Sequence, residues 1–228
     1  YHFHDPELMF VGSFLRLFNK KVIYDAHEDF PQQVYLKHYL PNYISIIISK
    51  LAQAAMFCTI RFFNQIITVT PHIEKKLKKL NPNVNIIHNY PNIKEFPTTA
   101  TNEKKQNVCY VGMISFARGL KEICLAIEST SGNLFIGGKP ASNKESVFLK
   151  KNNKINYLGF LDRKKIQQTF SKSVAGIMVA HPMDNMLYSF PVKLFEYMSA
   201  GLPVIISNFP VWKAIIDKHQ CGICVEPT

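Results

Sequence analysis

The stretch YSFPVKLFEYMSAGLPVIISN, from Tyr188 to Asn208, carries the strongest structural signal in this chain of 228 residues. Pro191 fits the first turn of a helix, where a missing N–H costs nothing. Gly201 followed by Pro203 predicts a left-handed cap and a stop, so we expect a helix of roughly ten residues. The run LPVIIS that follows is short, apolar and β-branched, which is typical of a parallel strand buried on both faces.

Two charged residues on this predicted helix indicate what it binds. Lys193 and Glu196 are three residues apart and share a helix face. The unpaired N–H groups at the helix start and the ammonium of Lys193 favour an anion such as a diphosphate. Glu196 can accept hydrogen bonds from sugar hydroxyls. The alternative on spacing alone is a surface helix with an ion pair between these two side chains.

Apolar, strand-like runs alternate with charged, helical segments along the whole chain. Before Pro91 the order is KVIYDA, a helical region from about Pro41, QIITVT, IEKKLKKL and VNIIHNY. After Gln106 it is NVCYVGMI, a helix at about 120–130, NLFIGG, a basic loop, INYLGF, a helix at 163–170, AGIMVA, the segment above, a short helix and GICVEP. This alternation predicts parallel sheets with helices on their faces.

The stretch between these two series, Pro91–Gln106, is rich in prolines, threonines and charges and reads as a linker. We therefore predict an α/β chain of two domains, residues 1–95 and 107–228, joined by a linker at 96–106. Both ends look cut, because the chain opens inside the strand–turn region YHFHDPEL and stops just after a predicted strand. We expect a fragment in which both domains are incomplete.

The motif P-x-K-L-F-E-Y-M-x-A-G-x-P-V-I resembles the donor-site segment of retaining glycosyltransferases of family four. NVCYVGMISFARGLKEI resembles the first strand and glycine-rich loop of the C-terminal domain in that family. Further landmarks resemble the family in the same order along the chain: VIYDAHEDFPQQ, IITVTPHI, IIHNYPNIKEF, LFIGGKP, INYLGFLDRKKIQQTF and GIMVAHP. The resemblance implies the GT-B fold, two Rossmann-like domains whose parallel sheets face each other across a cleft, both incomplete here.

The same resemblance implies a reaction. A hexose or N-acetylhexosamine would pass, with retention of configuration, from a nucleotide sugar to a saccharide or lipid-linked acceptor. UDP-sugar is the expected donor, and envelope or capsular polysaccharide or another glycan is the expected product. No bound metal or other cofactor is expected, because positive side chains would stabilise the leaving diphosphate.

Gly112–Gly119 follows a predicted strand and precedes a helix, which is the context in which backbone approaches a phosphate. Arg118 would offer a planar fork to diphosphate oxygens. Related enzymes have an arginine where this chain has Met113, so one expected cation is missing, and we expect Gly112, Arg118 and Lys193 to bind the donor. The alternative for Arg118 is a surface arginine beside a turn glycine.

Glu196 matches the second of two glutamates in the family, which implies that it holds the nucleotide's ribose and belongs to the catalytic machinery. The first glutamate falls at Tyr188, which can hydrogen-bond but carries no negative charge at neutral pH. Ser189 and the loop after it are expected, with Tyr188, to contact donor oxygens.

His27 ends a predicted strand, and strand carboxyl ends are where open α/β sheets bind ligands. It resembles the family's histidine near the reacting sugar, so we predict a catalytic role. Asp25 and Glu28 flank it and would tune its pKa or engage the acceptor. His2 and His4 resemble the preceding strand end and are expected to line the acceptor side.

A net charge of +11 favours an anionic partner. The basic residues are scattered except in KKLKKL, at 75–80, and no nucleic-acid motif is visible, so we expect no nucleic-acid partner. A basic enzyme acting on lipid diphosphates at a cytoplasmic leaflet accounts for the excess charge. We therefore expect a cytoplasmic protein, peripheral at an anionic membrane surface.

The nearest approach to a membrane span is Tyr43–Ile60, which carries Lys50 and Gln53 and is followed by Arg61. We expect a largely buried amphipathic helix, and the alternative is a helix whose apolar face dips into a bilayer surface. The five cysteines include a C-x-x-C at Cys221–Cys224. A second pair or a helix start is missing, so we expect buried thiols and no metal or redox site.

Two rival functions fit the same fold. A sugar-nucleotide epimerase would need additional acid and base carboxylates and no acceptor. A catalytically silent scaffold would bind the nucleotide sugar without turnover, and Tyr188 in place of a glutamate favours it. A dinucleotide dehydrogenase is not supported, because no G-x-G-x-x-G follows a strand.

Overall fold

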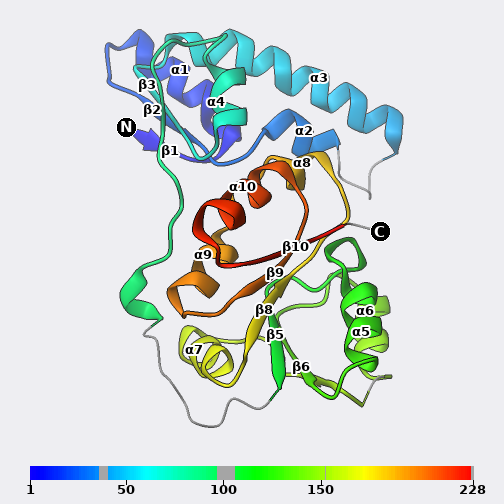
Figure 1. Cartoon of the computed structure of the whole chain (residues 1–228). Coiled ribbons are helices and arrows are strands. Elements are labelled where there is room, and N and C mark those ends of the chain that lie inside the picture. Colours follow the sequence, from blue (N-terminus) through cyan, green and yellow to red (C-terminus); the bar gives the residue numbers. More distant parts are fainter. Residues whose placement is uncertain (36–40, 97–105, 152, 227–228) are drawn as a thin grey trace. The chain divides into compact units, whose positions relative to one another are not determined.

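We describe a computed structural model of the chain, which covers residues 1–35, 41–96, 106–151 and 153–226 (Figure 1). The chain divides into two units. The N-terminal unit is Tyr1–Asn89 with Tyr188–Phe190, and the C-terminal unit is Tyr90–Leu187 with Pro191–Thr228. Most of the expected linker, residues 97–105, lies outside the described part. Each unit contains one parallel sheet, so the expected α/β class is confirmed.

The N-terminal unit is a four-stranded parallel sheet in the order β1-β2-β3-β4. Its strands are β1 (His2–Phe3), β2 (Ile23–Ala26), β3 (Gln65–Thr68) and β4 (Val84–Ile86). Its helices are α1 (Met9–Leu17), α2 (Phe30–Tyr35), α3 (Asn42–Thr59) and α4 (Pro71–Leu77). Tyr24 and Ile66 point from the sheet into a core that also holds Met9 and Ile60 from the helical side.

The C-terminal unit is a six-stranded parallel sheet in the order β10-β9-β8-β5-β6-β7. The strands are β5 (Asn107–Val111), β6 (Asn133–Gly137), β7 (Ile155–Tyr157), β8 (Ala175–Met178), β9 (Val204–Ser207) and β10 (Gly222–Val225). The helices are α5 (Leu120–Glu128), α6 (Asn143–Leu149), α7 (Arg163–Ser171), α8 (Asp184–Leu187), α9 (Val192–Ser199) and α10 (Pro210–His219).

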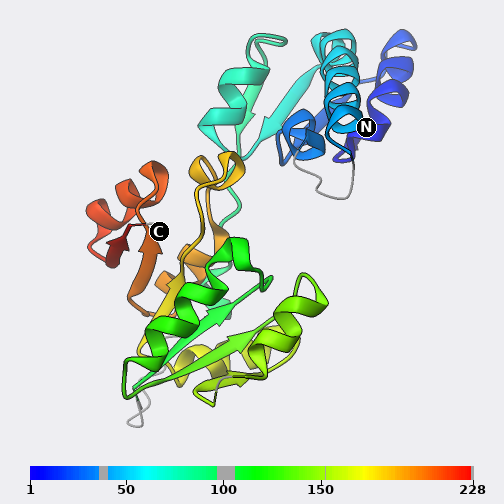
Figure 2. The ribbon, with the colours of Figure 1, turned by 90° about the vertical axis from the view of Figure 1, so that its right-hand side faces the viewer.

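Side chains alternate across this second sheet. Cys109 and Val111 of β5 enter one core with residues of α7, α9 and α10, whereas Tyr110 enters another with residues of α5 and α6 (Figures 1 and 2). Both faces of the sheet are therefore covered. The strand order reverses between β5 and β8, because the chain runs outward to β7 and then returns to the other side of β5. Ligands of open α/β sheets bind at the carboxyl ends of strands at such a reversal.

The segment from Tyr188 to Asn208 folds as a helix followed by a buried parallel strand, as expected. The helix is shorter than predicted, eight residues, because Pro191 is extended (φ −82°, ψ 109°) and precedes it as the N-cap. Gly201 has φ +68°, the left-handed conformation that ends the helix. The strand β9 pairs in parallel with β8 and β10.

Two expectations about local structure are wrong. The basic stretch after β6 is a helix, α6, where a loop was expected. The side chain of Ser142 accepts a hydrogen bond from the backbone N–H of Lys144 and donates one to Glu145 at 2.5 Å, so Ser142 and Glu145 form a capping box. Among the cysteines, Cys109 and Cys124 are buried as expected, but Cys58 is exposed, and Cys221 and Cys224 are only half-buried.

The expectation that Tyr43–Ile60 forms a largely buried helix is also wrong. By length and composition Tyr43–Phe62 could cross a membrane, and only 33% of its most apolar window is buried. The buried stripe of α3 contains Ser45, Ser49, Ala52, Met56 and Thr59, while large apolar side chains face outward, namely Ile46, Ile47, Ile48, Leu51 and Phe57. Most large apolar side chains of α3 therefore lie outside the core, unlike those of a helix that packs its whole apolar face on a core.

Candidate functional site

The first candidate site lies at the strand reversal of the C-terminal unit, where β5 ends. Gly112 follows β5 with φ +141°, a conformation that side chains rarely adopt. A Cβ atom at this position would overlap Nζ and Cε of Lys193. The lysine of α9 therefore lies directly against the backbone of the glycine loop, and the structure brings two of the predicted donor residues together.

Burial and a neighbouring charge dominate the electrostatics of Lys193. The pKa of Lys193 is lowered to about 7, chiefly by burial and then by the positive charge of Arg118, while the carboxylate of Glu196 opposes this shift in part. Its Nζ also lies 4.7 Å from the ring centroid of Tyr110, a cation–π contact. Among the described residues, neither Lys193 nor Arg118 forms an ion pair with a carboxylate.

Arg118 ends a short 3₁₀ helix, Phe116–Arg118, in the loop between β5 and α5. Gly119 follows with φ +70° and is the N-cap of α5, and a Cβ atom there would lie 2.5 Å from Cγ2 of Val179. Burial raises the pKa of Tyr110, and the charge and a hydrogen bond of Arg118 lower it in part. Arg118 is therefore held beside Tyr110 and Lys193, so two cations share one corner of the site.

Glu196 lies one turn further along α9 and is only 7% exposed. It accepts a hydrogen bond from Nη1 of Arg163 at 2.5 Å, and the Nε of the same guanidinium lies 3.3 Å from Glu95 Oε2. The hydrogen bond to Glu196 raises the pKa of Arg163. The ion pair expected on spacing, between Glu196 and Lys193, is thus replaced by one with Arg163, a residue that the motifs did not single out.

Tyr188 and Ser189 belong to the N-terminal unit, whereas Gly112, Arg118, Lys193 and Glu196 belong to the C-terminal unit. Tyr188 is 43% exposed. The contact of Tyr188 and Ser189 with a donor remains a prediction.

In the N-terminal unit, four side chains converge at the carboxyl ends of β1 and β2. The Oδ2 atom of Asp25 lies 3.6 Å from His2 Nε2, 3.2 Å from His4 Nδ1 and 3.4 Å from His27 Nε2. Asp25 is 8% exposed, while His27 and the neighbouring Glu28 are exposed. The structure therefore brings His2, His4, Asp25 and His27 together at the strand ends where the sequence predicted a site.

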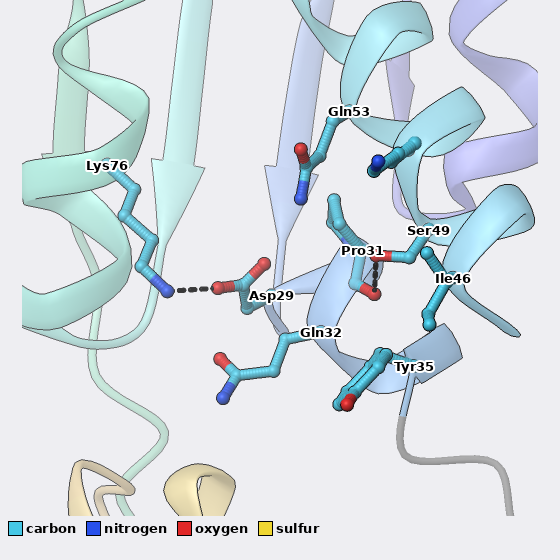
Figure 3. A pocket seen from close by; sticks show the side chains of 9 residues that line it. Asp29, Pro31, Gln32, Tyr35, Ile46, Ser49, Gln53 and Lys76 are labelled. Carbon is cyan, nitrogen blue, oxygen red and sulfur yellow. Dashed lines mark hydrogen bonds and ion pairs between the residues drawn. The ribbon is translucent and has the colours of Figure 1, made fainter. Parts of the chain in front are cut away.

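A pocket of about 400 Å³ lies in the same unit, beside α2, α3 and α4 (Figure 3). Lys76 Nζ lies 2.5 Å from Asp29 Oδ2 on one side, and Ser49 donates a 2.8 Å hydrogen bond to the carbonyl of Pro31 on the other. The remaining lining residues are Gln32, Tyr35, Ile46, Lys50 and Gln53. The sequence analysis missed this pocket, because its residues come from three separate helices and form no motif.

Residues 92–228 match the family described as "Glycosyl transferases group 1". No curated protein sequence matches the chain.

Solved structures with a similar fold include sucrose-phosphate synthase from Thermosynechococcus elongatus, with a TM-score of 0.74 and 17% identity over 100% of this chain and 60% of that chain. HepE from Anabaena, solved with UDP and glucose, has a TM-score of 0.71 and 13% identity over 99% of this chain and 64% of that chain. WaaG, a glycosyltransferase involved in lipopolysaccharide biosynthesis, has a TM-score of 0.62 and 14% identity over 95% of this chain and 67% of that chain.

The chain thus spans 60% and 64% of the length of the first two similar structures. At these identities the likeness concerns the fold. The similar structures are GT-B glycosyltransferases, and the expected GT-B architecture of two parallel-sheet units is confirmed.

Proposed function

Because the chain belongs to the glycosyl transferases group 1 family, we propose that its protein transfers a sugar from a nucleotide sugar to a saccharide or lipid-linked acceptor. The observation that carries this proposal is the pair of cations, Lys193 and Arg118, gathered at the strand reversal of the C-terminal unit. A buried ammonium beside a guanidinium is costly, and an anion placed between them offsets that cost.

A nucleotide diphosphate fits this corner in three respects. Lys193 supplies a charge and Arg118 a planar fork for phosphate oxygens, while the bare backbone of Gly112 allows close approach. Glu196 would accept hydrogen bonds from the ribose, held in orientation by Arg163. In transfer, the two cations would stabilise the charge that develops on the leaving diphosphate, so this step needs no metal.

UDP is the nucleotide we propose first, since a protein of the same fold was solved with UDP and glucose. The sugar is a hexose or an N-acetylhexosamine, and the retention of configuration is a proposal from the family resemblance. Tyr188 and Ser189 would contact the donor sugar, where Tyr188 offers a hydrogen bond in place of a carboxylate.

The acceptor is proposed to bind the N-terminal unit. His27 would act near the reacting hydroxyl, oriented by Asp25. The pocket beside α2 and α3 combines amide, carboxylate and ammonium groups with the ring of Tyr35, a mixture that suits a sugar's hydroxyls and its apolar face. The product that we propose is a cell-envelope polysaccharide or another glycan.

Titration calorimetry followed by a turnover assay tests this function. The full-length protein is titrated with UDP, GDP, ADP and their common sugar conjugates, and the best binder is then supplied with glycan acceptors. Nucleotide release that depends on an acceptor supports the proposal. Binding without any turnover would indicate the scaffold, a changed sugar without an acceptor would indicate an epimerase, and the absence of all binding would contradict a nucleotide-sugar function.

Nucleotide binding is expected to take up protons above neutral pH. In the free protein the pKa of Lys193 is lowered to about 7, so its amine is mostly neutral at higher pH. A bound diphosphate favours the ammonium and raises that pKa in the complex. Affinity for UDP should therefore fall by up to about tenfold per pH unit as the pH rises from about 7 to about 9.

Calorimetry in buffers of different ionisation enthalpy measures this proton uptake directly. At about pH 8 the terminal phosphate of UDP, with a pKa of about 6, is already deprotonated and contributes little. The Lys193→Met variant serves as the control and should show no uptake. Equal uptake in both proteins would place the titrating group elsewhere.

The exposed apolar side of α3 supports a peripheral location at the cytoplasmic face of a membrane, which we include in the proposal. Ile47 and Leu51 are 55% and 64% exposed, one turn apart on the same helix. Lys50 is exposed next to Leu51, and Arg61, just after α3, lies over the exposed ring of Phe57, so the surface combines apolar and basic groups. Such helices lie in the interface of anionic bilayers.

Replacing Leu51 with glutamate is expected to weaken binding to phosphatidylglycerol vesicles by at least about tenfold, since burying one leucine contributes about 1.5–3 kcal/mol. Gln53→Glu, an added carboxylate at an exposed polar position of the same helix, is the matched control. Cosedimentation measures both variants. Equal losses would mean that charge alone governs binding, and no vesicle binding by the unmodified protein would contradict the membrane location.

A further inference from the structure

The four side chains at the ends of β1 and β2 form a cluster whose chemistry the proposed transfer reaction does not use in full. His2 lies in β1 and His4 directly follows that strand, while Asp25 lies in β2 and His27 directly follows it. Their ring nitrogens and one carboxylate oxygen meet in a small volume. One nitrogen each of His2 and His4 and one carboxylate oxygen of Asp25 all lie within 4.8 Å of one another.

The distances within the cluster match those between the ligands of one metal ion. Nitrogen and oxygen ligands at about 2.0–2.1 Å from a tetrahedral ion lie about 3.3–3.4 Å from each other. Asp25 Oδ2 lies 3.6, 3.2 and 3.4 Å from nitrogens of His2, His4 and His27. The nitrogens His4 Nδ1 and His27 Nε2 are 3.1 Å apart. The distances from Asp25 Oδ2 to His2 and His4 lie close to this edge length, and the ligand atoms of His2 and His4 are within 4.8 Å of each other.

Charge within the cluster also favours a cation. Asp25 is 8% exposed, and among the described residues its second oxygen, Oδ1, is a buried atom with no hydrogen-bond partner. One carboxylate can balance one protonated imidazole, and three imidazoles converge on it. Any of these imidazoles that is neutral and turns a lone pair toward Asp25 gains from a cation bound between them.

We propose that His2, His4 and Asp25 bind a divalent transition-metal cation of the zinc type, with the fourth position open to water. Imidazole nitrogens with one carboxylate suit zinc, copper, nickel or iron, whereas magnesium and calcium prefer oxygen ligands. A bound ion would join the ends of β1 and β2 beside His27. The proposal rests on the geometry of the N-terminal unit and not on the proposed transfer reaction.

The sequence predicts no metal site, because positive side chains would stabilise the leaving diphosphate and because the C-x-x-C of the C-terminal unit has no second pair. The proposed site lies elsewhere, in the N-terminal unit. The missed signal is the spacing His2-x-His4. Alternate residues of an extended chain point to the same side, and the ring centroids of His2 and His4 are 4.8 Å apart.

Zinc titration of the chelator-treated protein tests the site. The background carries Cys58→Ser, because Cys58 is exposed and a free thiol also binds zinc. We expect one equivalent to bind, and His4→Ala to weaken binding by at least about 100-fold, since even the hydrogen-bond partner of a ligand contributes about 10- to 100-fold. His219→Ala, an exposed histidine of α10, is the matched control and should bind as before.

Cobalt as a probe identifies the ligands independently. The visible absorption of bound Co²⁺ should indicate a four-coordinate nitrogen and oxygen site and should disappear in His2→Ala as well as in His4→Ala. His2 is exposed on its strand, so its loss is not expected to unfold the unit, and circular dichroism checks this. Zinc binding that is unchanged in both variants, or matched by magnesium, would overturn the proposal and leave protonated histidines paired with Asp25.

Discussion

Lys193→Met is expected to abolish most of the affinity for the donor nucleotide while leaving the fold at least as stable. Removing one partner of a buried charge pair costs about 2–5 kcal/mol of binding, or at least about thirtyfold in Kd. Stability should not fall, because burial lowers the pKa of Lys193 to about 7 and the charged form is therefore disfavoured in the free protein. Methionine keeps the length of the side chain beside Tyr110.

Calorimetric titration with UDP and thermal unfolding measure these two effects on the same samples. Lys218→Ala, at an exposed position of α10, is the control for a change in net charge and should bind UDP like the unmodified protein. A Lys193→Met variant that binds UDP normally would remove the lysine from the donor site. One that unfolds more readily would show that its charge is compensated in the free protein.

Gly138→Ala is expected to destabilise the C-terminal unit by about 2–6 kcal/mol, because backbone strain and overpacking each cost roughly 1–3 kcal/mol. Gly138 has φ +140°, and a Cβ atom there would overlap the carbonyl oxygen of Gly112. A backbone atom cannot move aside as a side chain can. The loop that supports Lys193 would therefore shift, and nucleotide affinity should fall together with stability.

Gly159→Ala is the matched control for this substitution. Gly159 also has positive φ, +70°, but no atom lies within 4 Å of the position of an added Cβ. We expect a loss of about 1–2 kcal/mol from strain alone. Trp212 is the single tryptophan and is buried in the C-terminal unit, so its fluorescence reports the unfolding of that unit. Equal losses in the two variants would mean that the Gly112–Gly138 contact does not constrain the loop.

The sequence predicts those parts of the fold whose signal is local. The apolar runs QIITVT and PVIISN are strands, and the charged segment after Asp162 is a helix, because periodicity and capping act within a few residues. The capping box Ser142-x-x-Glu145 is equally local and indicates α6. The prediction of a loop relies instead on the basic composition of that stretch and is wrong. Composition is the weaker signal where a cap is present.

Pairings between distant residues are not predictable in this way. Glu196 pairs with Arg163, 33 residues away, because both lie at one corner of the unit and Lys193 turns instead to Gly112 and Tyr110. Helical spacing indicated only that Lys193 and Glu196 share a face. The pocket beside α2 and α3 is likewise assembled by tertiary packing. The prediction that α3 is largely buried is wrong, because hydropathy does not show whether an apolar helix face packs on the protein core or stays exposed.

The central claim is that the cations at the strand reversal of the C-terminal unit hold the diphosphate of a nucleotide donor. A crystal structure of the full-length protein with UDP tests it most directly. We predict diphosphate oxygens within hydrogen-bond distance of Lys193 Nζ and the Arg118 guanidinium, and ribose hydroxyls on Glu196. A well-ordered UDP whose diphosphate contacts neither cation would contradict the account.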